Sequence, residues 1–515
     1  MMKKNTAAAK AAPRPVGYLW LIERFELSVL PCYHQSLVWS RSRREVHHQP
    51  DCVEDYFPQR MEPGNTLGEQ LEFAIEHDGI DLGILTALFQ KTDPNELAEY
   101  IKQKPLGRNT RRIWYLYEFL TEELLPLDDL TSGGYFELLD SKRYYTSGSE
   151  FRRIRRQRVL DNLLGTAEFC PIVRRTEKLA EYETIDFGER LTTIASRYNP
   201  DLQLRASNFL YLKETKSSFD IEREVLDESR TERFVGILKQ LPNEDLLSSG
   251  KLIDLQHQIV DPRFAETDYR AKQNYVGESI DWGREKIHYI PPPPGDLHSL
   301  MNGIFDSHRR MSLGGIHPVI HATVVAYGFV YMHPFEDGNG RIHRLLIHNV
   351  LGSRGFTPYG TIFPVSAAML LDMRAYDRSL ESFSAPLMRL PNLSYRLNED
   401  GEIAVEGNEG WYYRYMDMTH QVEAMFGFIT STIDDVFVSQ LDFLSSYDQA
   451  RHDIQRIVDL PNPKLSLFIK ICGQNHGRLA SSKRKRLFSE LTDDEIARME
   501  RAFREAFDFD EPDED

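Results

Sequence analysis

The sequence predicts a mainly α-helical fold that holds one short β-hairpin, with further helical regions toward both ends of the chain. Apolar residues recur at helical spacing through much of residues 19–184, as they do over residues 67–75. The strongest apolar run, residues 318–332, is too long for a strand and therefore indicates a buried helix. Residues 275–290 instead have the aromatic and β-branched content of a hairpin that turns at residues 281–283.

The composition limits the number of domains and the class of partner. A chain of 515 residues exceeds the size that one hydrophobic core supports, so two or three domains are expected. The formal net charge of −17 argues against a surface that binds nucleic acid or an anionic membrane. Four scattered cysteines are typical of reduced thiols in a cytosol, and no apolar run is long enough to span a membrane. We therefore expect a cytoplasmic protein with protein and small-molecule partners, and homodimer formation stays open.

The amino-terminal elements are predicted to be a tail followed by a helical region. Residues 1–15 are rich in Ala and Lys and contain two prolines, which is typical of a flexible tail. Residues 16–185 are predicted to be mostly helical. No motif in them assigns a role, so the function of this region stays open.

Residues 391–515 predict a carboxy-terminal helical module with an acidic tail. They begin with a polar stretch, and a capping box from Thr492 to Glu495 marks the start of a late helix. The basic run at residues 483–486 is compatible with a DNA-binding winged helix. The acidic end at residues 508–515 favours packing or contact with a protein partner instead.

The most informative segment is residues 333–344, which read His-Pro-Phe-Glu-Asp-Gly-Asn-Gly-Arg-Ile-His-Arg. The helix before it should end at His333, because Pro334 disfavours the α conformation in the preceding residue. Gly338 and Gly340 permit backbone angles closed to other residues and let a ligand approach the main chain. A second helix is expected to start near Gly340, since apolar residues repeat at helical spacing beyond it.

This loop and helix start predict a site for a polyphosphate. A helix start after a glycine loop offers free N–H groups and a positive dipole end to an anion. Arg341 and Arg344 lie three residues apart and so add two guanidinium groups on one face. Asp337 supplies a hard oxygen ligand for Mg²⁺, and His333 has a side chain suited to removing a proton from a hydroxyl. The residues therefore predict a nucleotidyl or phosphoryl transfer site.

Simpler interpretations of the same residues compete with the predicted transfer site. A glycine-rich turn before a helix is often only a turn. His343 and His348 suggest a metal pair, but their spacing of five residues places them on different helix faces, which disfavours a metal site.

The whole string resembles the signature of the Fic family, in which His, Phe, an acidic residue, Gly-Asn-Gly-Arg and a second Arg recur at fixed spacing. The resemblance implies a Fic helical core at residues 186–390, with an inhibitory helix at residues 201–224 and a flap at residues 272–290. It further implies a protein adenylyltransferase (AMPylase), with ATP as substrate and Mg²⁺ as cofactor. A Tyr, Thr or Ser hydroxyl of a target protein, or of the chain itself, attacks the α-phosphorus and pyrophosphate leaves.

The resemblance also assigns roles to single residues. His333 is the general base, Phe335 packs the nucleotide-binding loop onto the core, and Asp337 binds Mg²⁺. The residues implied to hold the phosphates are Gly338, Asn339 and Gly340 for the α-phosphate, and Arg341 and Arg344 for the outer phosphates.

Two further assignments have plain alternatives of similar weight. Tyr376 lies where similar proteins often place a ring near the adenine, although an ordinary packed tyrosine fits as well. Tyr275, Val276 and Gly277 resemble the start of the flap, which holds a target segment by strand addition. A surface hairpin without that role fits the same residues.

Residues 218–223, Ser-Phe-Asp-Ile-Glu-Arg, resemble the inhibitory motif of the family. Ser218 and Glu222 are four residues apart and so share a face of the expected helix. The resemblance implies that Glu222 pairs with Arg344 and keeps the γ-phosphate from its productive place. Arg223 departs from the motif, which has Gly or Asn there, and a long cation beside Glu222 would weaken the restraint. A solvated polar stripe is the plainer alternative.

Two other functions are compatible with the same residues. The site would serve equally for removing AMP from a modified protein, or the chain would sense nucleotides with negligible turnover. The intact His333 argues against the sensor, because binding alone requires no base. The sequence does not separate addition of AMP from its removal.

Overall fold

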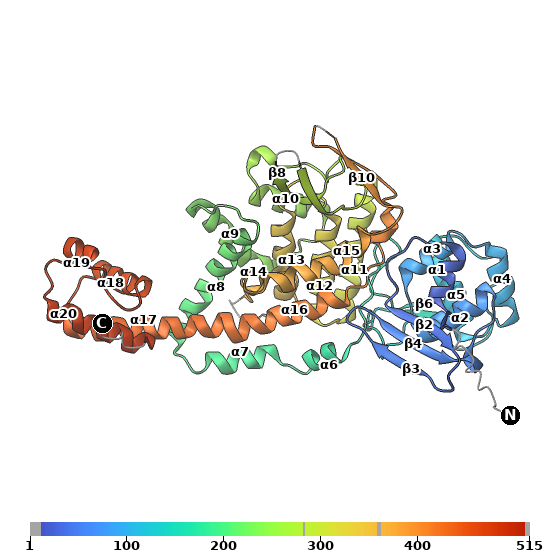
Figure 1. Cartoon of the computed structure of the whole chain (residues 1–515), viewed down its shortest axis with the longest axis horizontal. Coiled ribbons are helices and arrows are strands. Elements are labelled where there is room, and N and C mark those ends of the chain that lie inside the picture. Colours follow the sequence, from blue (N-terminus) through green and yellow to red (C-terminus); the bar gives the residue numbers. More distant parts are fainter. Residues whose placement is uncertain (1–11, 282–283, 358–361, 399, 510–515) are drawn as a thin grey trace, which may run out of the picture. The chain divides into compact units, whose positions relative to one another are not determined.

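A computed structural model of the chain describes residues 12–281, 284–357, 362–398 and 400–509 (Figure 1). Helices predominate over a few small sheets, which confirms the predicted fold class. The chain divides into two compact units. Unit 1 comprises Met1–Thr184, Glu222–Phe356 and Asp372–Gly427, and unit 2 comprises Ile185–Ile221, Thr357–Leu371 and Phe428–Asp515.

The amino-terminal part of unit 1 contains two sheets, so the prediction of a mostly helical region at residues 16–185 missed its strands. The first sheet has the order β1-β2-β4-β3, in which β2 and β4 are parallel and the other neighbours antiparallel. The second sheet has the order β5-β7-β6. The strands are β1 (Arg14–Pro15), β2 (His34–Trp39), β3 (Glu45–His48), β4 (Val53–Pro58), β5 (Phe136–Glu137), β6 (Arg152–Ile154) and β7 (Val159–Asp161).

Polar residues inside the first sheet explain why its strands escape recognition. The buried positions alternate along β2 and β4, but they include Ser36 and Asp55. Asp55 accepts a hydrogen bond from Arg44 Nε at 2.8 Å and lies 3.3 Å from the His34 ring. A buried polar cluster thus interrupts the apolar alternation that identifies a strand.

The predicted tail at residues 1–15 extends too far. Arg14 and Pro15 pair with Val38 and Leu37 of β2, so the last two residues of that segment belong to the sheet. Residues 1–11 lie outside the described part of the chain.

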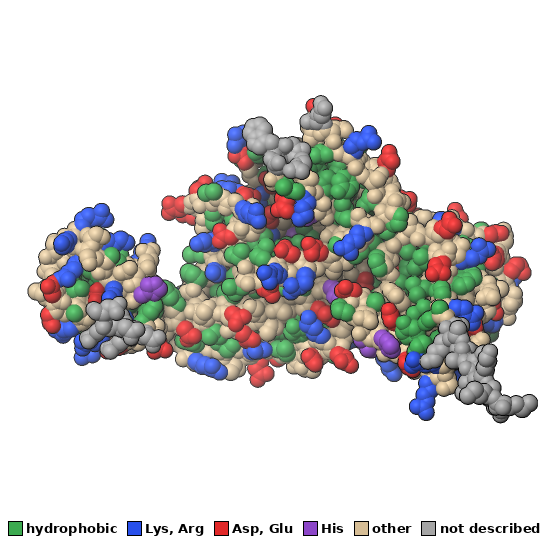
Figure 2. Space-filling view, in the orientation of Figure 1, with side chains coloured by type: hydrophobic (Ala, Val, Ile, Leu, Met, Phe, Trp, Pro, Cys, Tyr) green, Lys and Arg blue, Asp and Glu red, His purple; other side chains and the backbone are tan. Residues whose placement is uncertain are grey.

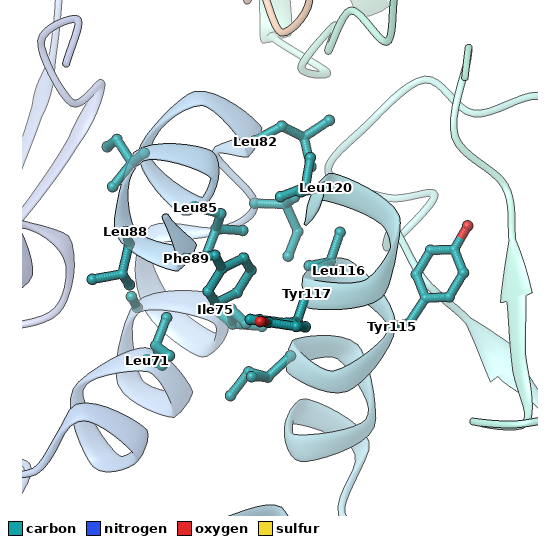
Figure 3. Packing of buried hydrophobic residues seen from close by; sticks show 14 of the residues in the cluster. Leu71, Ile75, Leu82, Leu85, Leu88, Phe89, Tyr115, Leu116, Tyr117 and Leu120 are labelled. Atoms are coloured by element: carbon teal, nitrogen blue, oxygen red, sulfur yellow. The ribbon is translucent and has the colours of Figure 1, made fainter. Parts of the chain in front are cut away.

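Helices build the core of this amino-terminal part. Figure 3 shows apolar side chains of α3 facing those of α5, and the rings of Phe89 and Tyr117 lie 5.2 Å apart. Residues 67–75 are buried in large part, as their helical spacing predicted. The helices are α1 (Tyr18–Phe25), α2 (Leu67–Phe73), α3 (Leu82–Phe89), α4 (Pro94–Gln103), α5 (Arg108–Thr121) and α6 (Glu177–Glu183).

The middle of unit 1 holds the elements around the candidate site. The apolar run at residues 318–332 forms α12 (Pro318–Met332), which is buried along nearly its whole length and packs against α11 and α13. The predicted hairpin is formed by β8 and β9, and residues 282–283 of its turn lie outside the described residues. The remaining elements here are α9 (Glu228–Gln240), α10 (Ser249–Ile259), β8 (Val276–Asp281), β9 (Arg284–Tyr289), α11 (Leu297–Gly314), α13 (Asn339–Ser353) and α15 (Met373–Leu387).

Residues 391–515 contain a second hairpin before their helices. The polar stretch expected at the start of this region pairs as β10 (Ser394–Leu397) with β11 (Ile403–Glu406), so the region is helical only beyond it. The helix α16 (Thr419–Ser431) follows.

Unit 2 is helical in its described part. Its elements are α7 (Phe187–Ala195), α8 (Pro200–Ile221), α14 (Val365–Leu371), α17 (Val438–Ile457), α18 (Asn462–Gln474), α19 (Ser481–Leu487) and α20 (Asp493–Phe507). The capping box of Thr492 and Glu495 begins α20 as predicted. Residues 438–509 form no strand, so the described part of the module lacks the wing of a winged helix. Residues 510–515 of the predicted acidic tail are outside the described residues.

The distribution of surface charge and the lengths of the helices both bear on which partners the chain can have. On the face shown in Figure 2, acidic and basic side chains are interspersed over the middle of the molecule. None of the helices in the described part of the chain combines the length and apolar character needed to cross a membrane.

Candidate active site

The site begins where α12 ends. The last helical residue is Met332, and His333 adopts the left-handed conformation with φ 47° and ψ 56°. Its N–H still donates to the Phe329 carbonyl at 3.1 Å. Pro334 excludes the α conformation at His333, and histidine tolerates the left-handed region better than most residues. The predicted helix end is therefore confirmed, and the sharp turn directs the chain into a loop.

The loop ends at Gly338, and α13 starts one residue earlier than predicted. Gly338 has φ 93°, a conformation that strains any residue with a Cβ. The backbone N–H of Ile342 donates to the Gly338 carbonyl at 2.9 Å, which closes the first helical turn. The N–H groups at the start of this turn have no carbonyl partner within the helix, so they can donate to an anion, as the predicted site requires.

Asn339 and Phe335 fix the shape of the loop. The Asn339 amide donates to the Phe335 carbonyl at 2.6 Å and its oxygen accepts from the Phe335 N–H at 3.1 Å. The Phe335 ring is fully buried and meets Tyr269 edge-on at 5.7 Å. Phe335 thus packs the loop onto the core, and the Asn339 side chain is occupied in holding the loop closed.

Arg341 and Arg344 are almost completely buried, with 2% and 1% of their side chains exposed. Each one is engaged by carboxylates. Arg341 lies 2.9 Å from Asp337 and 2.9 Å from Glu224, and it also donates to the Ile259 carbonyl at 3.0 Å. The positive charge of the anion site is therefore partly neutralised by groups of the chain itself.

Glu222 occupies the place next to Arg344. Its Oε1 lies 2.8 Å from Arg344 Nη2, and a Cβ added to Gly340 would come within 2.1 Å of the same oxygen. Burial pushes the pKa of Glu222 upward, but the Arg344 and Arg341 guanidinium groups outweigh it and lower the pKa overall. An ionised carboxylate thus lies against the first turn of α13, where an anionic ligand would bind.

The prediction that Glu222 lies on a helix face with Ser218 is wrong in one respect. Ser218 is buried within α8, but that helix ends at Ile221, so Glu222 lies in the turn that follows. Arg223 has φ 57° in this turn. The left-handed conformation explains why Gly or Asn suits the position. Among the described residues Arg223 forms no ion pair, so it does not compete for Glu222.

His333 is suited to act as a base in its surroundings. Burial and then the nearby Arg270 guanidinium lower its pKa to about 4, against smaller opposing effects of a hydrogen bond to the Val330 backbone, Glu222 and Asp337. The imidazole is therefore neutral at pH 7 and can accept a proton.

Asp337 and the histidines of α13 differ in their availability to a metal. Half of the Asp337 side chain, 52%, is exposed, so the carboxylate retains room for a ligand beside Arg341. His343 Nδ1 instead lies 2.8 Å from the Ala326 carbonyl inside the core. The described residues contain no group of three His, Cys, Asp or Glu side chains placed to hold a metal ion.

The remaining predicted residues lie on two other elements. Tyr376 is buried on α15, and its ring stacks on His343 with centroids 6.3 Å apart. Val276 and Gly277 begin β8, where the register with β9 shifts, and the Tyr275 hydroxyl contacts Glu285. The hairpin is thus present, and no contact of its strands bears on a target.

Comparison with known proteins decides the family of this segment. Residues 246–351, which include the whole loop and α13 up to Leu351, match the family model described as "Fic/DOC family". This segment is a Fic domain.

Relatives of the Fic domain are found among curated proteins and solved structures. "Protein adenylyltransferase Fic" of Aedes aegypti is 30% identical over 144 residues, and the protein of that name from Nematostella vectensis is 37% identical over 90 residues. These alignments cover 27% and 18% of this chain and 26% and 19% of the relatives, so the chain spans about a quarter or less of their length. The crystal structure of a Fic family protein from Desulfovibrio desulfuricans aligns with a TM-score of 0.36 at 17% identity, covering 65% of this chain and 86% of that chain.

Residues that the sequence did not single out also contact the signature loop and α13. Glu224 pairs with Arg341, and Glu266 accepts from the backbone N–H of Glu336 at 2.9 Å. Arg270 donates to the carbonyl of His333 at 2.9 Å. Glu224 was within reach of sequence reasoning, since it is two residues from Glu222 and carries the same charge. Nothing near Glu266 or Arg270 in the sequence indicates their position beside the loop.

Proposed function

We propose that the chain transfers AMP from ATP to a Tyr, Thr or Ser hydroxyl of a protein and releases pyrophosphate. The observation that carries the proposal is a neutral His333 at the edge of an anion site built from the start of α13, Arg341 and Arg344. The target is another protein or the chain itself. We place the activity of this chain in the cytoplasm, because its four cysteines are free thiols, as is usual for cytosolic proteins.

Each residue has a distinct task in this reaction. His333 takes the proton of the target hydroxyl while its oxygen bonds to the α-phosphorus, and the bond from that phosphorus to the bridging oxygen breaks. The N–H groups of α13 and the two arginines hold the triphosphate in line for the attack. The pyrophosphate leaves with the electron pair of the broken bond.

Asp337 fits a Mg²⁺ ion that arrives with the nucleotide. Mg²⁺ favours one or two carboxylates together with phosphate oxygens, and Asp337 offers a half-exposed carboxylate at the end of the anion site. The ion would supply charge neutralisation of the phosphates. Arg341 now contacts this carboxylate at 2.9 Å and would orient it.

The direct test is incubation of the purified chain with a cell lysate, Mg²⁺ and ATP labelled on the α-phosphate. Label should appear on a protein band, and ATP labelled on the γ-phosphate should leave no label. Label from the γ-phosphate would indicate phosphoryl transfer and overturn the proposal. Loss of AMP from a premodified target under the same conditions would indicate removal rather than addition. Parallel assays with CTP, GTP and UTP test the nucleotide.

We further propose that two carboxylates restrain the site until nucleotide displaces them. Arg344 and Arg341 are the two arginines assigned to the phosphates. Glu222 pairs with Arg344 at 2.8 Å, and Glu224 pairs with Arg341 at 2.9 Å. Glu224 also contacts Arg230 at 2.5 Å, so its release leaves it with another cation. Both arginines must exchange a carboxylate for phosphate oxygens before the triphosphate is fully held.

Removing the arginines should weaken ATP binding more than AMP binding, because both are assigned to the outer phosphates. In a Glu222→Gly background, Arg341→Ala and Arg344→Ala should each raise the Kd for ATP at least tenfold, or about 1.4 kcal/mol, and that for AMP less than about threefold. Isothermal titration calorimetry measures both ligands. Arg354→Ala is the matched control, since Arg354 follows the far end of α13 and its guanidinium binds the backbone carbonyls of Ser312 and Ile316. Equal losses for ATP and AMP would assign the arginines to folding instead.

A further inference from the structure

Arg270 is a buried arginine that joins the signature loop to the hairpin. Only 3% of the residue is exposed. Its backbone N–H donates to the Pro334 carbonyl at 2.8 Å, and its Nε donates to the His333 carbonyl at 2.9 Å. Its two terminal nitrogens donate to the carbonyls of Lys272 at 2.8 Å and Pro292 at 2.6 Å. One side chain therefore binds the residue assigned as base and the two chain segments that enter and leave the hairpin.

The charge of Arg270 is not explained by a carboxylate partner. Among the described residues it forms no ion pair, and its guanidinium is surrounded by carbonyl oxygens. Burial lowers its pKa to about 10, so the group is still charged at pH 7. Glu336 and Glu266 lie near enough to favour its charge, but neither forms an ion pair with it in the described chain. A buried cation that no carboxylate contacts directly is costly, which argues that the planar fork of donors serves a purpose that a neutral side chain does not.

His333 requires such support. Its left-handed conformation, with φ 47°, is strained for a residue other than glycine. Arg270 binds its carbonyl, and two side chains slightly further along the chain add hydrogen bonds to the same segments. Asn274 donates to the Phe335 carbonyl at 3.3 Å, and Gln273 donates to the Pro291 carbonyl at 2.9 Å. The segment from residue 270 to residue 274 thus ties the loop and the hairpin at several points.

We infer that Arg270 is a positioning residue, which fixes His333 relative to the hairpin so that base and target hydroxyl meet. The inference rests on the proposed function, because it takes His333 as base, and it takes the hairpin as the flap that the sequence led us to expect, where a target segment binds. A strand of the target that pairs with the hairpin would be held at a set distance from His333 only while this connection is rigid.

The charge of Arg270 gives the inference a second readout. Three charged groups face His333, namely Arg270, Glu222 from the turn after α8 and Asp337 from the loop. Arg270 favours the neutral imidazole and the two carboxylates favour the protonated one. A neutral residue at position 270 should therefore raise the pKa of His333 from about 4 toward its ordinary value of 6.5.

The experiment compares variants in an active Glu222→Gly parent. Arg270→Lys keeps the charge but not the fork, and it should lower kcat for transfer at least tenfold while the Kd for ATP changes less than about threefold. Arg270→Gln removes the charge, and the acidic limb of its kcat/KM profile should move to higher pH. Guanidinium chloride at low millimolar concentration should restore part of the activity of Arg270→Gly. Arg354→Lys is the control, because Arg354 also binds three backbone carbonyls without an ion pair among the described residues.

The outcomes separate the two proposals. A parent that transfers no AMP would overturn the proposed function. A parent that is active, with Arg270→Lys as active as Arg354→Lys, would overturn the role of Arg270. Should Arg270→Lys fail to bind ATP or to fold, Gln273→Ala removes the hydrogen bonds to the Pro291 and Asn274 carbonyls and tests the same connection. That variant should raise the KM for the target protein, and an unchanged KM would contradict the inference.

Discussion

Replacing His333 by alanine should reduce AMP transfer about 10²- to 10⁴-fold, the contribution typical of a positioned general base. The imidazole is neutral at pH 7 because burial and Arg270 hold its pKa at about 4. Nucleotide binding should persist, since the phosphates are assigned to α13 and its arginines. Transfer of labelled AMP gives the rate, and calorimetry with ATP shows whether the site is intact.

The left-handed conformation of His333 makes the choice of variant important. Alanine at φ 47° adds backbone strain, so His333→Asn is the matched control, because asparagine tolerates this region and lacks a base of similar strength. Both variants should lose transfer to the same degree. If either one transfers AMP at the parent rate while binding ATP, His333 is not the base.

The low pKa of His333 also sets a pH dependence. The group has its ordinary pKa of 6.5 in the unfolded chain and about 4 in the folded chain, so the unfolded state binds more protons between these values. The stability contributed by neutral His333 is therefore present above pH 6.5 and is lost as the pH falls toward 4. His333→Asn should be less sensitive to acid over this range, which chemical denaturation at several pH values would measure.

Replacing Glu222 by glycine should raise the rate of transfer from ATP at least tenfold, which corresponds to about 1.4 kcal/mol of relieved restraint. The carboxylate is ionised, lies 2.8 Å from Arg344 and occupies the first turn of α13. Its removal frees both the guanidinium and the space over Gly340 for the outer phosphates. Glu222→Gln should act in the same direction by removing the charge alone.

Two comparisons show whether the effect belongs to this carboxylate. Arg223→Gly relieves the left-handed strain in the turn and should leave the restraint in place, since Arg223 forms no ion pair in the described chain. Glu224→Gln should raise the rate further when combined with Glu222→Gly, because it frees Arg341. A Glu222→Gly protein that is folded and transfers AMP at the parent rate would show that the pairing with Arg344 does not inhibit.

The candidate site was predictable because most of its chemistry is local in sequence. The twelve residues from His333 to Arg344 contain the helix end, the glycine loop, the helix start and both arginines, and each obeys a short-range backbone rule. The contacts of Arg270 and Glu224 with this loop span 63 and 117 residues of sequence. Such contacts depend on how distant segments pack around α13, and a short-range sequence pattern does not predict that packing.

The errors in the predicted fold have equally specific causes. Ser36 and Asp55 place polar groups at inward positions of the first sheet, so its strands lack an apolar alternation. Glu222 is at helical spacing from Ser218, yet the left-handed Arg223 turns the chain away directly after Ile221. The spacing therefore suggested a shared helix face where the chain forms a turn.

The contact between Glu222 and Gly340 makes the restraint a ligand that is covalently tethered to its own binding site. For a tethered ligand the relevant quantity is an effective concentration, which is on the order of millimolar or higher for short connections. Dilution of the protein leaves that quantity unchanged, whereas free ATP competes with it in proportion to its own concentration. The degree of inhibition should thus be independent of how much enzyme is present and should fall in a graded way as ATP rises. The restraint would in this way set the range of ATP concentration over which modification of the target rises.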